Sequence, residues 1–510
     1  MKKVVILFFI PLFALSFSIN AQQKKTKKIE IINADELSFE KTQNKSLQRL
    51  IGNVIFEHEG AKMYCDSAYF YGKQNSMEAF GNVKIEMGDS VNMFCDYLKY
   101  DGTLKTVYAR KNVKLFHKNS KLFTDSLDFY RKSGIAKYYT FGTIITEEDT
   151  LTSNYGYYQS RTRNFFPSGN VIVRNPRFIM HTDSLRFNTK RKTVYFLTKT
   201  DIKSDSARII CYSGHYNTID DDALFGKNTF IQSKSKILKG DSLFYNAQKD
   251  YGEGYIYFLV IDTTNKMLAS GKFGIYNGKA NEIMTTDSAI MMIIDSNNDT
   301  LFLHSDTIVS KTDTNDNRMI FSYYNVRFYK TDLQGACDSL IYSMSDSTIY
   351  MYKKPILWSD NYQLFAKEIN ILSDRGGIKE VDMIDKGMIT EKLDSIKYNQ
   401  IKGKNIYAYF QNNNISHITV ETNAETIYYP LNDKDQYIGM YKASSKNISI
   451  SMNNNEVSRI VFYKNTNGVL YPIDQLPNDK LMLTGFKWMG KHRPHKKTDI
   501  FLKNNYSLFE

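Results

Sequence analysis

Hydrophobic and polar residues alternate with a period of two in many short stretches of the chain. The stretch 81–87 (GNVKIEM) shows the pattern most clearly, and the stretches 52–56, 111–115 and 169–173 repeat it. Such alternation is typical of a half-buried β-strand, and the abundance of Val, Ile, Thr, Tyr and Phe in these windows also favours strands. Because no convincing helical periodicity occurs outside the N-terminus, the pattern predicts an all-β fold.

A second strand motif, Asp-Ser-Leu-x-Phe, recurs in step with the first. Its clear copies begin at Asp66, Asp125, Asp183, Asp241 and Asp338, and weaker copies fall midway, so the repeat is about 29 residues long. A unit of two strands that short cannot bury a core alone. We expect the units to stack as an elongated array in parallel register, about 4.8 Å apart, with Gly or Asn at the entry of each upstream strand.

Strand parity divides the side chains between two faces. The Leu and Phe of the second motif are expected inside, whereas Lys84, Asp128 and Arg186 are expected to face solvent. The recurring Asp residues form a column, in which stacked like charges would repel. We therefore expect them to cap turns or to accept hydrogen bonds from backbone donors rather than to form an acidic ladder.

The repeat unit changes near residue 360. Lys404-Asn405-Ile406 recurs as Lys446-Asn447-Ile448, an offset of 42 residues. The sequence therefore predicts a signal peptide (1–21), a basic segment (22–32), repeats of about 29 residues (33–360), variant β repeats of about 42 residues (361–480) and a basic tail (481–510).

The N-terminus has the three regions of a secretory signal peptide. Lys2 and Lys3 precede an apolar run, 4–19, which is short for a membrane span and ends in small residues. We expect cleavage after Ala21 and a soluble periplasmic product, and association with the outer membrane stays open. An uncleaved N-terminal anchor is the alternative.

The four cysteines share one repeat position, directly before the Asp of the second motif. This column, Cys65, Cys95, Cys211 and Cys337, takes small residues elsewhere, which suits a buried free thiol. Only Cys65 and Cys95 lie in adjacent rungs, so a disulfide between them remains open. We expect no metal ligation by these residues.

The formal net charge of +13 is concentrated at the two ends of the chain. Lysines at 2, 3, 24, 25, 27 and 28 and the basic residues between 487 and 497 carry most of it, which leaves a nearly neutral body. This distribution argues against a phosphate-tracking stripe along the array, and so against a nucleic-acid partner.

Two motifs suggest chemistry but do not support it. Gly240-Asp241-Ser242-Leu243 matches the GDSL esterase signature, but no His has an Asp three residues before it. Asp295, Asn297, Asp299 and Asp306 fit a calcium-loop template in which Thr300 replaces the required Gly. We therefore expect no enzyme activity, catalytic residues, metal site or cofactor.

The tandem Gly-Asn-Val and Asp-Ser-Leu-x-Phe strands, together with Ala34–Phe39 as the opening strand, resemble the OstA-like (organic solvent tolerance) family, relatives of the periplasmic lipopolysaccharide-transport protein LptA. The resemblance implies an elongated open β-jellyroll, or β-taco, whose apolar groove holds the acyl chains of lipopolysaccharide or a similar amphiphile. It also implies end-to-end docking with other β-jellyroll transport components, which bridges the inner and outer membranes for outer-membrane assembly.

Twelve inward positions are the candidate lipid-binding residues of this groove. They are Val83, Ile85, Val113, Leu115, Leu127, Phe129, Val171, Val173, Leu185, Phe187, Leu243 and Tyr245. Asp35, Leu37 and Phe39 are the candidate partner edge, because a terminal strand leaves unpaired backbone groups. The alternatives are a β-solenoid with a filled core, acting as an adhesin or spacer, and a polysaccharide lyase of the β-helix type.

Overall fold

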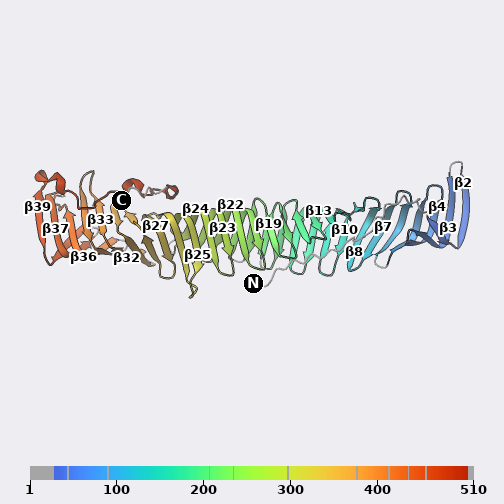
Figure 1. Cartoon of the computed structure of the whole chain (residues 1–510), viewed down its shortest axis with the longest axis horizontal. Helices are drawn as coiled ribbons and strands as arrows, with labels where there is room; N and C mark the ends of the chain where they lie inside the picture. The colour runs from blue at the N-terminus through green and yellow to red at the C-terminus, as the bar shows by residue number, and fades with distance from the viewer. Residues whose placement is uncertain are drawn as a thin grey trace. The chain divides into compact units, whose positions relative to one another are not determined.

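The computed structural model describes residues 28–502 apart from 43–44, 89–90, 206, 234, 296–297, 375–376, 412–413, 435 and 454–455. The predicted signal peptide and its cleavage site after Ala21 lie outside these residues. Within the described part, the chain forms 39 strands and four short 3-10 helices (Figure 1), which confirms the prediction of an all-β fold of stacked strands. None of the described helices is long and apolar enough to cross a membrane.

The chain divides into two compact units. Unit 1 comprises residues 1–234 and 239–250, and unit 2 comprises 235–238 and 251–510. The first strands of unit 1 are β1 (Glu30–Asn33), β2 (Glu36–Thr42), β3 (Lys45–His58), β4 (Ala61–Tyr71), β5 (Ser76–Met87), β6 (Val91–Asp101), β7 (Thr106–His117), β8 (Ser120–Tyr130), β9 (Ile135–Tyr138) and β10 (Gly142–Ile145).

The next strands of unit 1 are β11 (Thr150–Ser153), β12 (Tyr155–Gln159), β13 (Asn164–Asn175), β14 (Phe178–Asn188), β15 (Thr193–Phe196), β16 (Thr200–Ser204), β17 (Ala207–Cys211), β18 (Gly214–Asn217), β19 (Asp222–Phe225) and β20 (Thr229–Ser233). Strand β21 (Lys236–Asn246) has residues in both units.

Unit 2 continues with β22 (Tyr251–Asp262), β23 (Met267–Asn277), β24 (Glu282–Ile294), β25 (Thr300–Thr312), β26 (Arg318–Tyr329), β27 (Gln334–Ser343), β28 (Thr348–Tyr352), β29 (Ile356–Ser359), β30 (Tyr362–Phe365), β31 (Glu368–Asp374), β32 (Gly377–Ile384), β33 (Gly387–Lys392), β34 (Tyr398–Gly403), β35 (Asn405–Gln411), β36 (Asn414–Tyr428), β37 (Gly439–Asn453), β38 (Glu456–Tyr463) and β39 (Asn467–Pro472). The 3-10 helices η1 (Ile473–Gln475), η2 (Asn478–Lys480), η3 (Gly490–His492) and η4 (Lys497–Phe501) follow.

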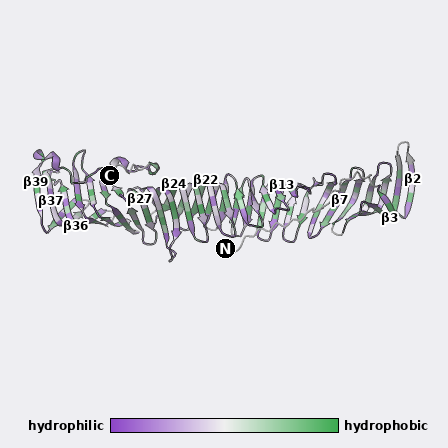
Figure 2. Cartoon of the chain, viewed as in Figure 1, coloured by the Kyte–Doolittle hydropathy of each residue, from purple (hydrophilic) through white to green (hydrophobic). Residues whose placement is uncertain are grey.

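Strand pairing is antiparallel, so the expected parallel register is wrong. Strand β5, for example, lies between β4 and β6, with Ala79 opposite both Ala68 and Leu98. The connections are tight turns such as 72–75, and turns that short join only antiparallel strands. Figure 2 shows hydrophobic and hydrophilic residues alternating along these strands, as the sequence pattern predicted.

The Gly-Asn pairs lie in the middle of strands, not at their beginnings as expected. In β5, Gly81 and Asn82 have φ angles of +70° and +45°, and the register with β6 shifts between Phe80 and Val83. A Cβ atom on Gly81 would lie 2.4 Å from Oδ2 of Asp66, so a larger residue would require the Asp66 side chain to move. Such a bulge bends its strand.

The bends divide unit 1 into two arms. Arm A holds the strand segments that meet at the four-residue turns 72–75, 102–105, 131–134, 160–163, 189–192, 218–221 and 247–250. Arm B holds the segments that meet at the turns 59–60, 118–119, 146–149 and 176–177. The apolar side chains between the arms are buried, as Leu98 on arm A and Val83 on arm B illustrate.

The recurring Asp residues fasten these bulges. Asp66 and Asp96 accept hydrogen bonds from the amides of Asn82 and Asn112 at 2.9 and 2.6 Å. Asp125 accepts one from the backbone N–H of Asn112 at 3.1 Å. The expectation of a backbone donor is therefore confirmed for Asp125, whereas Asp66 and Asp96 bond side-chain amides, and all three act at mid-strand.

The repeat position directly before the recurring Asp is occupied by cysteine in four copies. All four cysteines are buried free thiols, so Cys65 and Cys95 are not bridged. Burial raises the pKa of both thiols to about 12. Such thiols are unreactive at neutral pH, which gives them a packing role.

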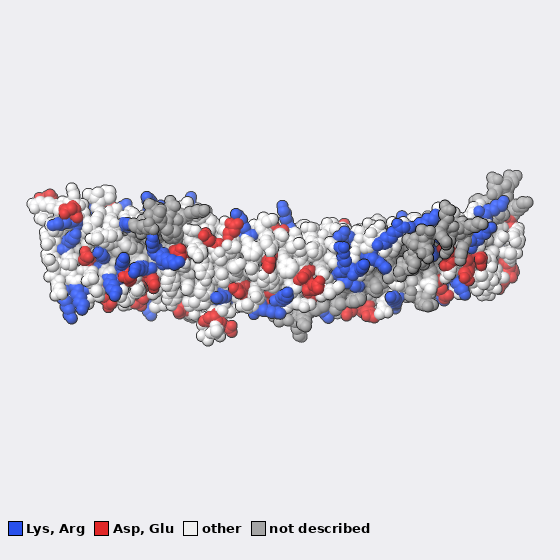
Figure 3. Space-filling model, viewed as in Figure 1, with Lys and Arg blue, Asp and Glu red and all other residues white. Residues whose placement is uncertain are grey.

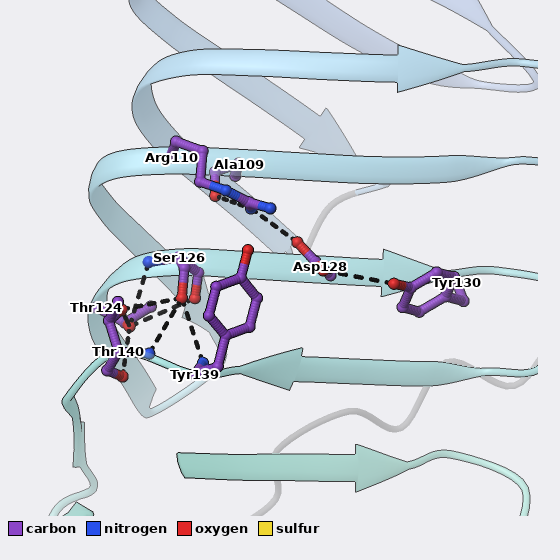
Figure 4. Close-up of polar contacts among 8 residues, drawn as sticks. All are labelled: Ala109, Arg110, Thr124, Ser126, Asp128, Tyr130, Tyr139 and Thr140. Carbon is purple, nitrogen blue, oxygen red and sulfur yellow. Dashed lines mark hydrogen bonds and ion pairs between the residues drawn. The ribbon is translucent and has the colours of Figure 1, made fainter. Parts of the chain in front are cut away.

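Figure 4 shows the next copy of the motif, in which Thr124 takes the position of the cysteine. The neighbouring chain segment is interrupted there, between β9 and β10. The hydroxyl of Ser126 accepts hydrogen bonds from the backbone N–H groups of Tyr139 and Thr140, at 3.2 and 3.3 Å. Asp128 is only 5% exposed and pairs with Arg110 at 2.7 Å. The expectation that Asp128 faces solvent is therefore wrong, because this ion pair covers it.

Residues 473–502, which we call the C-terminal strap, pack against one face of unit 2. The side chain of Gln363 in β30 donates to the carbonyl of Lys487 at 2.8 Å and accepts from the N–H of Met489 at 2.7 Å. Gln400 in β34 bonds the strap in the same way, and Leu483 is buried. The strap therefore covers a sheet face rather than adding a strand.

Candidate functional site

Unit 1 contains a cavity of about 280 Å³ between its two arms. Most of the lining side chains are apolar and come from β3 to β8 and the segment before β1. They are Ile29, Phe56, Met63, Met77, Ile85, Met87, Met93, Val107, Leu115, Leu127 and Phe129. Four of them are methionines, whose flexible thioethers adapt to irregular apolar partners. The lining therefore suits a hydrocarbon group better than a polar one.

Charged residues lie at the mouth of this cavity. The carboxylate of Glu59, in the arm B turn 59–60, pairs with Lys105 at 2.8 Å and with Arg131 at 2.7 Å. Both cations belong to turns of arm A, so the cluster joins the outer ends of the two arms. Partial burial alone would raise the pKa of Glu59, but the hydrogen bond from Lys105 and the two cationic charges lower it below its usual value.

A second polar contact flanks this cluster. Nδ1 of His58 lies 2.6 Å from the hydroxyl of Tyr100, which is in arm A. Burial raises the pKa of Tyr100 to about 12, so the phenol stays protonated. The mouth thus has three cross-arm contacts above an apolar interior, and ionic groups in such a setting orient an amphiphile rather than a purely apolar ligand.

The structure brings four of the twelve candidate groove residues to the cavity: Ile85, Leu115, Leu127 and Phe129. Val83, Val113, Val171, Val173, Leu185, Phe187 and Leu243 are also buried, whereas Tyr245 is half-buried. Val173 and Phe187 are at most 1% exposed, so the arms are closely packed around them. Lipid contact by these residues remains a prediction.

Sequence reasoning missed the residues at the mouth. Glu59, Lys105 and Arg131 lie in turns, where a charged residue is normally read as solvated, and 72 positions separate the farthest two. The lining residues Met63, Met77 and Met93 could have been found, because they have the same strand parity as Ile85.

The candidate partner edge lies at the first rung of unit 1. Strands β1 and β2 pair with β3 and with no other strand among the described residues. Leu37 and Phe39 are 47% and 70% exposed. Asp35 accepts from the amide of Asn53 at 2.9 Å and fastens the first bulge. The rung therefore ends in an exposed apolar edge.

The described residues hold no group of three or more His, Cys, Asp or Glu side chains that could bind a metal ion. At the calcium-like segment, the backbone N–H of Asp299 donates to the carboxylate of Asp295 at 2.9 Å. Lys330 pairs with Asp295 at 3.1 Å, so a cation of the chain itself binds this carboxylate, while Asn297 of the template lies outside the described residues.

The family model for OstA-like proteins matches residues 26–183. This part of the chain is an OstA-like domain. It contains every residue that lines the cavity, from Ile29 to Arg131. The OstA-like family is a binding and transport family connected with lipopolysaccharide and organic-solvent tolerance, and its members are typically periplasmic. No curated protein matches the chain.

Proposed function

We propose that the OstA-like domain binds lipopolysaccharide or a similar amphiphile in the periplasm, and shields its acyl chains during transport between the inner and outer membranes. The observation that carries this proposal is the methionine-rich apolar cavity between the arms, with ionic groups at its mouth. Ligand pockets are typically apolar clefts with a few placed polar groups, and this cavity has that composition.

Site-specific photo-crosslinking tests the proposal. A photoreactive side chain at Ile85 or Phe129, which line the cavity, should capture lipid during expression. The outward positions Lys84 and Arg186 should not, and Asp128 is avoided as a control because it is buried. Equal labelling at inward and outward positions, or no labelling anywhere, would contradict lipid binding in this cavity.

A filled structural solenoid is the second candidate function. The close packing around Val173 and Phe187 supports it, because little room for a ligand remains there. Crosslinkers at these two positions separate a local site from a continuous groove. Labelling at all four inward positions supports a groove, whereas labelling only at Ile85 and Phe129 supports a single site near the N-terminal end.

We further propose that the free edge of β2 docks a partner of the same β-fold by strand addition, with the C-terminal tail dispensable for that contact. The exposed side chains of Leu37 and Phe39 support this proposal.

We also propose that the protein is exported to the periplasm and cleaved after Ala21. N-terminal sequencing of the protein from a periplasmic fraction tests this. A first residue other than Gln22 would contradict that cleavage site.

A further inference from the structure

Five successive turns at the outer end of arm A, from 72–75 to 189–192, carry only positive charge. They have no Asp or Glu, whereas the next turns of the row, 218–221 and 247–250, contain Asp220, Asp221 and Asp250. We call the cations of the five turns the basic lip: Lys73, Lys105, Arg131, Lys132, Arg161, Arg163, Lys190, Arg191 and Lys192. Figure 3 shows a band of Lys and Arg side chains over the part of the view that unit 1 occupies. The expectation of no basic stripe along the array is therefore wrong for residues 72–192.

The basic lip is continuous. Backbone hydrogen bonds join each turn to the next, such as the N–H of Arg131 to the carbonyl of Lys105 at 3.1 Å and the N–H of Thr189 to that of Arg163 at 2.8 Å. Two strands separate successive turns, so the cations recur about every 10 Å along the lip.

The outer end of arm B has the opposite character. Its described turns carry Glu59, Glu147, Glu148, Asp149 and Asp205 against only Lys118 and Arg177. Over residues 59–192, the outer end of arm A is thus basic, whereas that of arm B is mainly acidic. A row of cations along one arm attracts anions, because their fields add where the spacing is close to the screening length of about 8 Å at physiological salt.

The basic lip and the apolar cavity meet at two residues. Lys105 and Arg131 belong to the lip and also line the cavity. Both are held there by the carboxylate of Glu59, which reaches across from arm B. An anionic amphiphile requires a lysine and an arginine that bind its charged group directly above apolar side chains. In this structure, the carboxylate of Glu59 is the anion bound between the two cations.

We propose that Lys105 and Arg131 bind the anionic headgroup of the amphiphile whose chain enters the cavity, and that Glu59 occupies the headgroup position when no ligand is bound. The proposal rests on the proposed function and adds the headgroup chemistry, which is a phosphate or a comparable anion. Arginine and lysine form short, charge-assisted hydrogen bonds with phosphate oxygens. A headgroup with two or more negative charges competes well with a single carboxylate.

Two amphiphiles with the same chain test this proposal. Dodecyl phosphate and dodecyl maltoside are titrated into the full chain by calorimetry, below the concentrations at which they form micelles. Dodecyl phosphate should bind at least about tenfold more tightly than dodecyl maltoside, because hydrogen bonds to charged groups are stronger than neutral ones. Equal affinities would overturn the headgroup site but leave the proposed function intact, whereas no binding of either would contradict the proposed function itself.

Variants at the mouth assign the effect to residues. The double variant Lys105→Gln/Arg131→Gln should weaken dodecyl phosphate binding about tenfold and leave dodecyl maltoside binding within about twofold. Glu59→Gln should strengthen dodecyl phosphate binding, because the competing anion is removed. Weaker binding by Glu59→Gln would overturn its role as a stand-in for the headgroup.

Two controls complete the design. Glu147→Gln removes an exposed acid from the same arm as Glu59 but away from the cavity, and should leave both affinities unchanged. Inorganic phosphate at the same concentration should not displace dodecyl phosphate, and full displacement would assign the cations to free phosphate instead. Circular dichroism and thermal unfolding of each variant show that the arms remain folded.

Discussion

A single buried carboxyl group in arm B connects the stability of unit 1 to pH. Asp149 is 3% exposed, and its Oδ1 accepts a hydrogen bond from Asn175 at 2.7 Å. Its Oδ2 is buried without a hydrogen-bond partner. Burial raises the pKa of Asp149 from its ordinary value to about 6, against the lowering effect of Asn175, and the charge of Glu148 raises it further.

The raised pKa of Asp149 predicts a gain in stability on mild acidification. The folded state binds a proton more tightly than the unfolded state, so the stability due to protonation is present below about pH 4 and lost as the pH rises through about 6. Asp149→Asn keeps the hydrogen bond and should stabilise unit 1 at pH 7.5 by on the order of 2 kcal/mol. Urea unfolding at pH 7.5 and 4.0 measures this difference.

The advantage of Asp149→Asn should shrink as the pH falls from 6 to 4, because the wild-type carboxyl group is then neutral in the folded state. Glu147→Gln, at an exposed neighbouring position, should change stability little at either pH. An advantage that stays constant over this range would mean that the asparagine acts through packing and not through charge.

At the scale of single residues, the sequence predicted strand parity well. The positions of Val83, Ile85 and Leu127 follow from alternation alone, because each strand buries one face. The bulge at Gly81 could not be placed, since Gly-Asn is equally common in turns. Its position depends on Asp66, which faces it from the neighbouring strand.

At the scale of elements, the C-terminal strap shows how polar residues hold an irregular segment on a sheet. Gln363 is fully buried and satisfies two backbone groups of the strap. Trp358 and Met489 belong to one small apolar cluster beside it. The sequence did not reveal this contact, because 124 residues separate Gln363 from Lys487 and the strap has no strand pattern.

Replacing Gln363 by methionine should release the strap. The side-chain volume is nearly kept, but a buried N–H and a buried carbonyl lose their partners, which should destabilise unit 2 by on the order of 2–3 kcal/mol. Denaturant unfolding and limited proteolysis at residues 473–502 measure the effect. Gln411→Met, at an exposed position in β35, is the matched control, and equal behaviour of the two variants would contradict this role of Gln363.

The edge strand β2 allows a sharper test of partner docking. The N–H of Asp35 donates to Gly52 in β3 at 3.0 Å, and Leu37 and Phe39 have the same parity, so their N–H groups also point to β3. The N–H of Ser38 then points to the free edge. Ser38→Pro should abolish docking without unfolding unit 1, because it removes only an outward donor.

Leu37→Pro is the contrasting variant, since it removes a donor within the β2–β3 ladder and should loosen the first rung itself. Capture of a partner β-jellyroll protein, compared for the two variants and for a chain lacking residues 487–510, is the measurement. Undiminished capture by Ser38→Pro together with loss on the C-terminal truncation would show that docking uses the opposite end.

At the scale of the whole molecule, composition concealed the separation of charge. The body as a whole is nearly neutral, because the basic turns of arm A are offset by acidic residues elsewhere in the chain, including those in the arm B turns 59–60 and 146–149. Turns such as 131–134 and 146–149 are close in sequence but belong to different arms. Only the strand bends, which place alternate turns on opposite arms, separate the two sets.

The far end of the basic lip should act on association rate rather than on affinity. Lys190 and Arg191 are exposed, and their turn is about 20 Å along the lip from that of Arg131. The Debye length is about 30 Å at 0.01 M salt but about 8 Å at 0.15 M. The field of these two cations therefore reaches the mouth of the cavity only at low salt.

Lys190→Gln/Arg191→Gln should accordingly slow the association of dodecyl phosphate severalfold at 0.01 M salt and leave it unchanged at 0.15 M, because steering depends on unscreened charge. Stopped-flow displacement of a fluorescent fatty acid measures the rates. Dodecyl maltoside is the control ligand, since a neutral headgroup should associate at the same rate with both proteins. A loss of equilibrium affinity at 0.15 M salt would instead mean that the headgroup contacts this turn directly, which would move the site two turns along the lip.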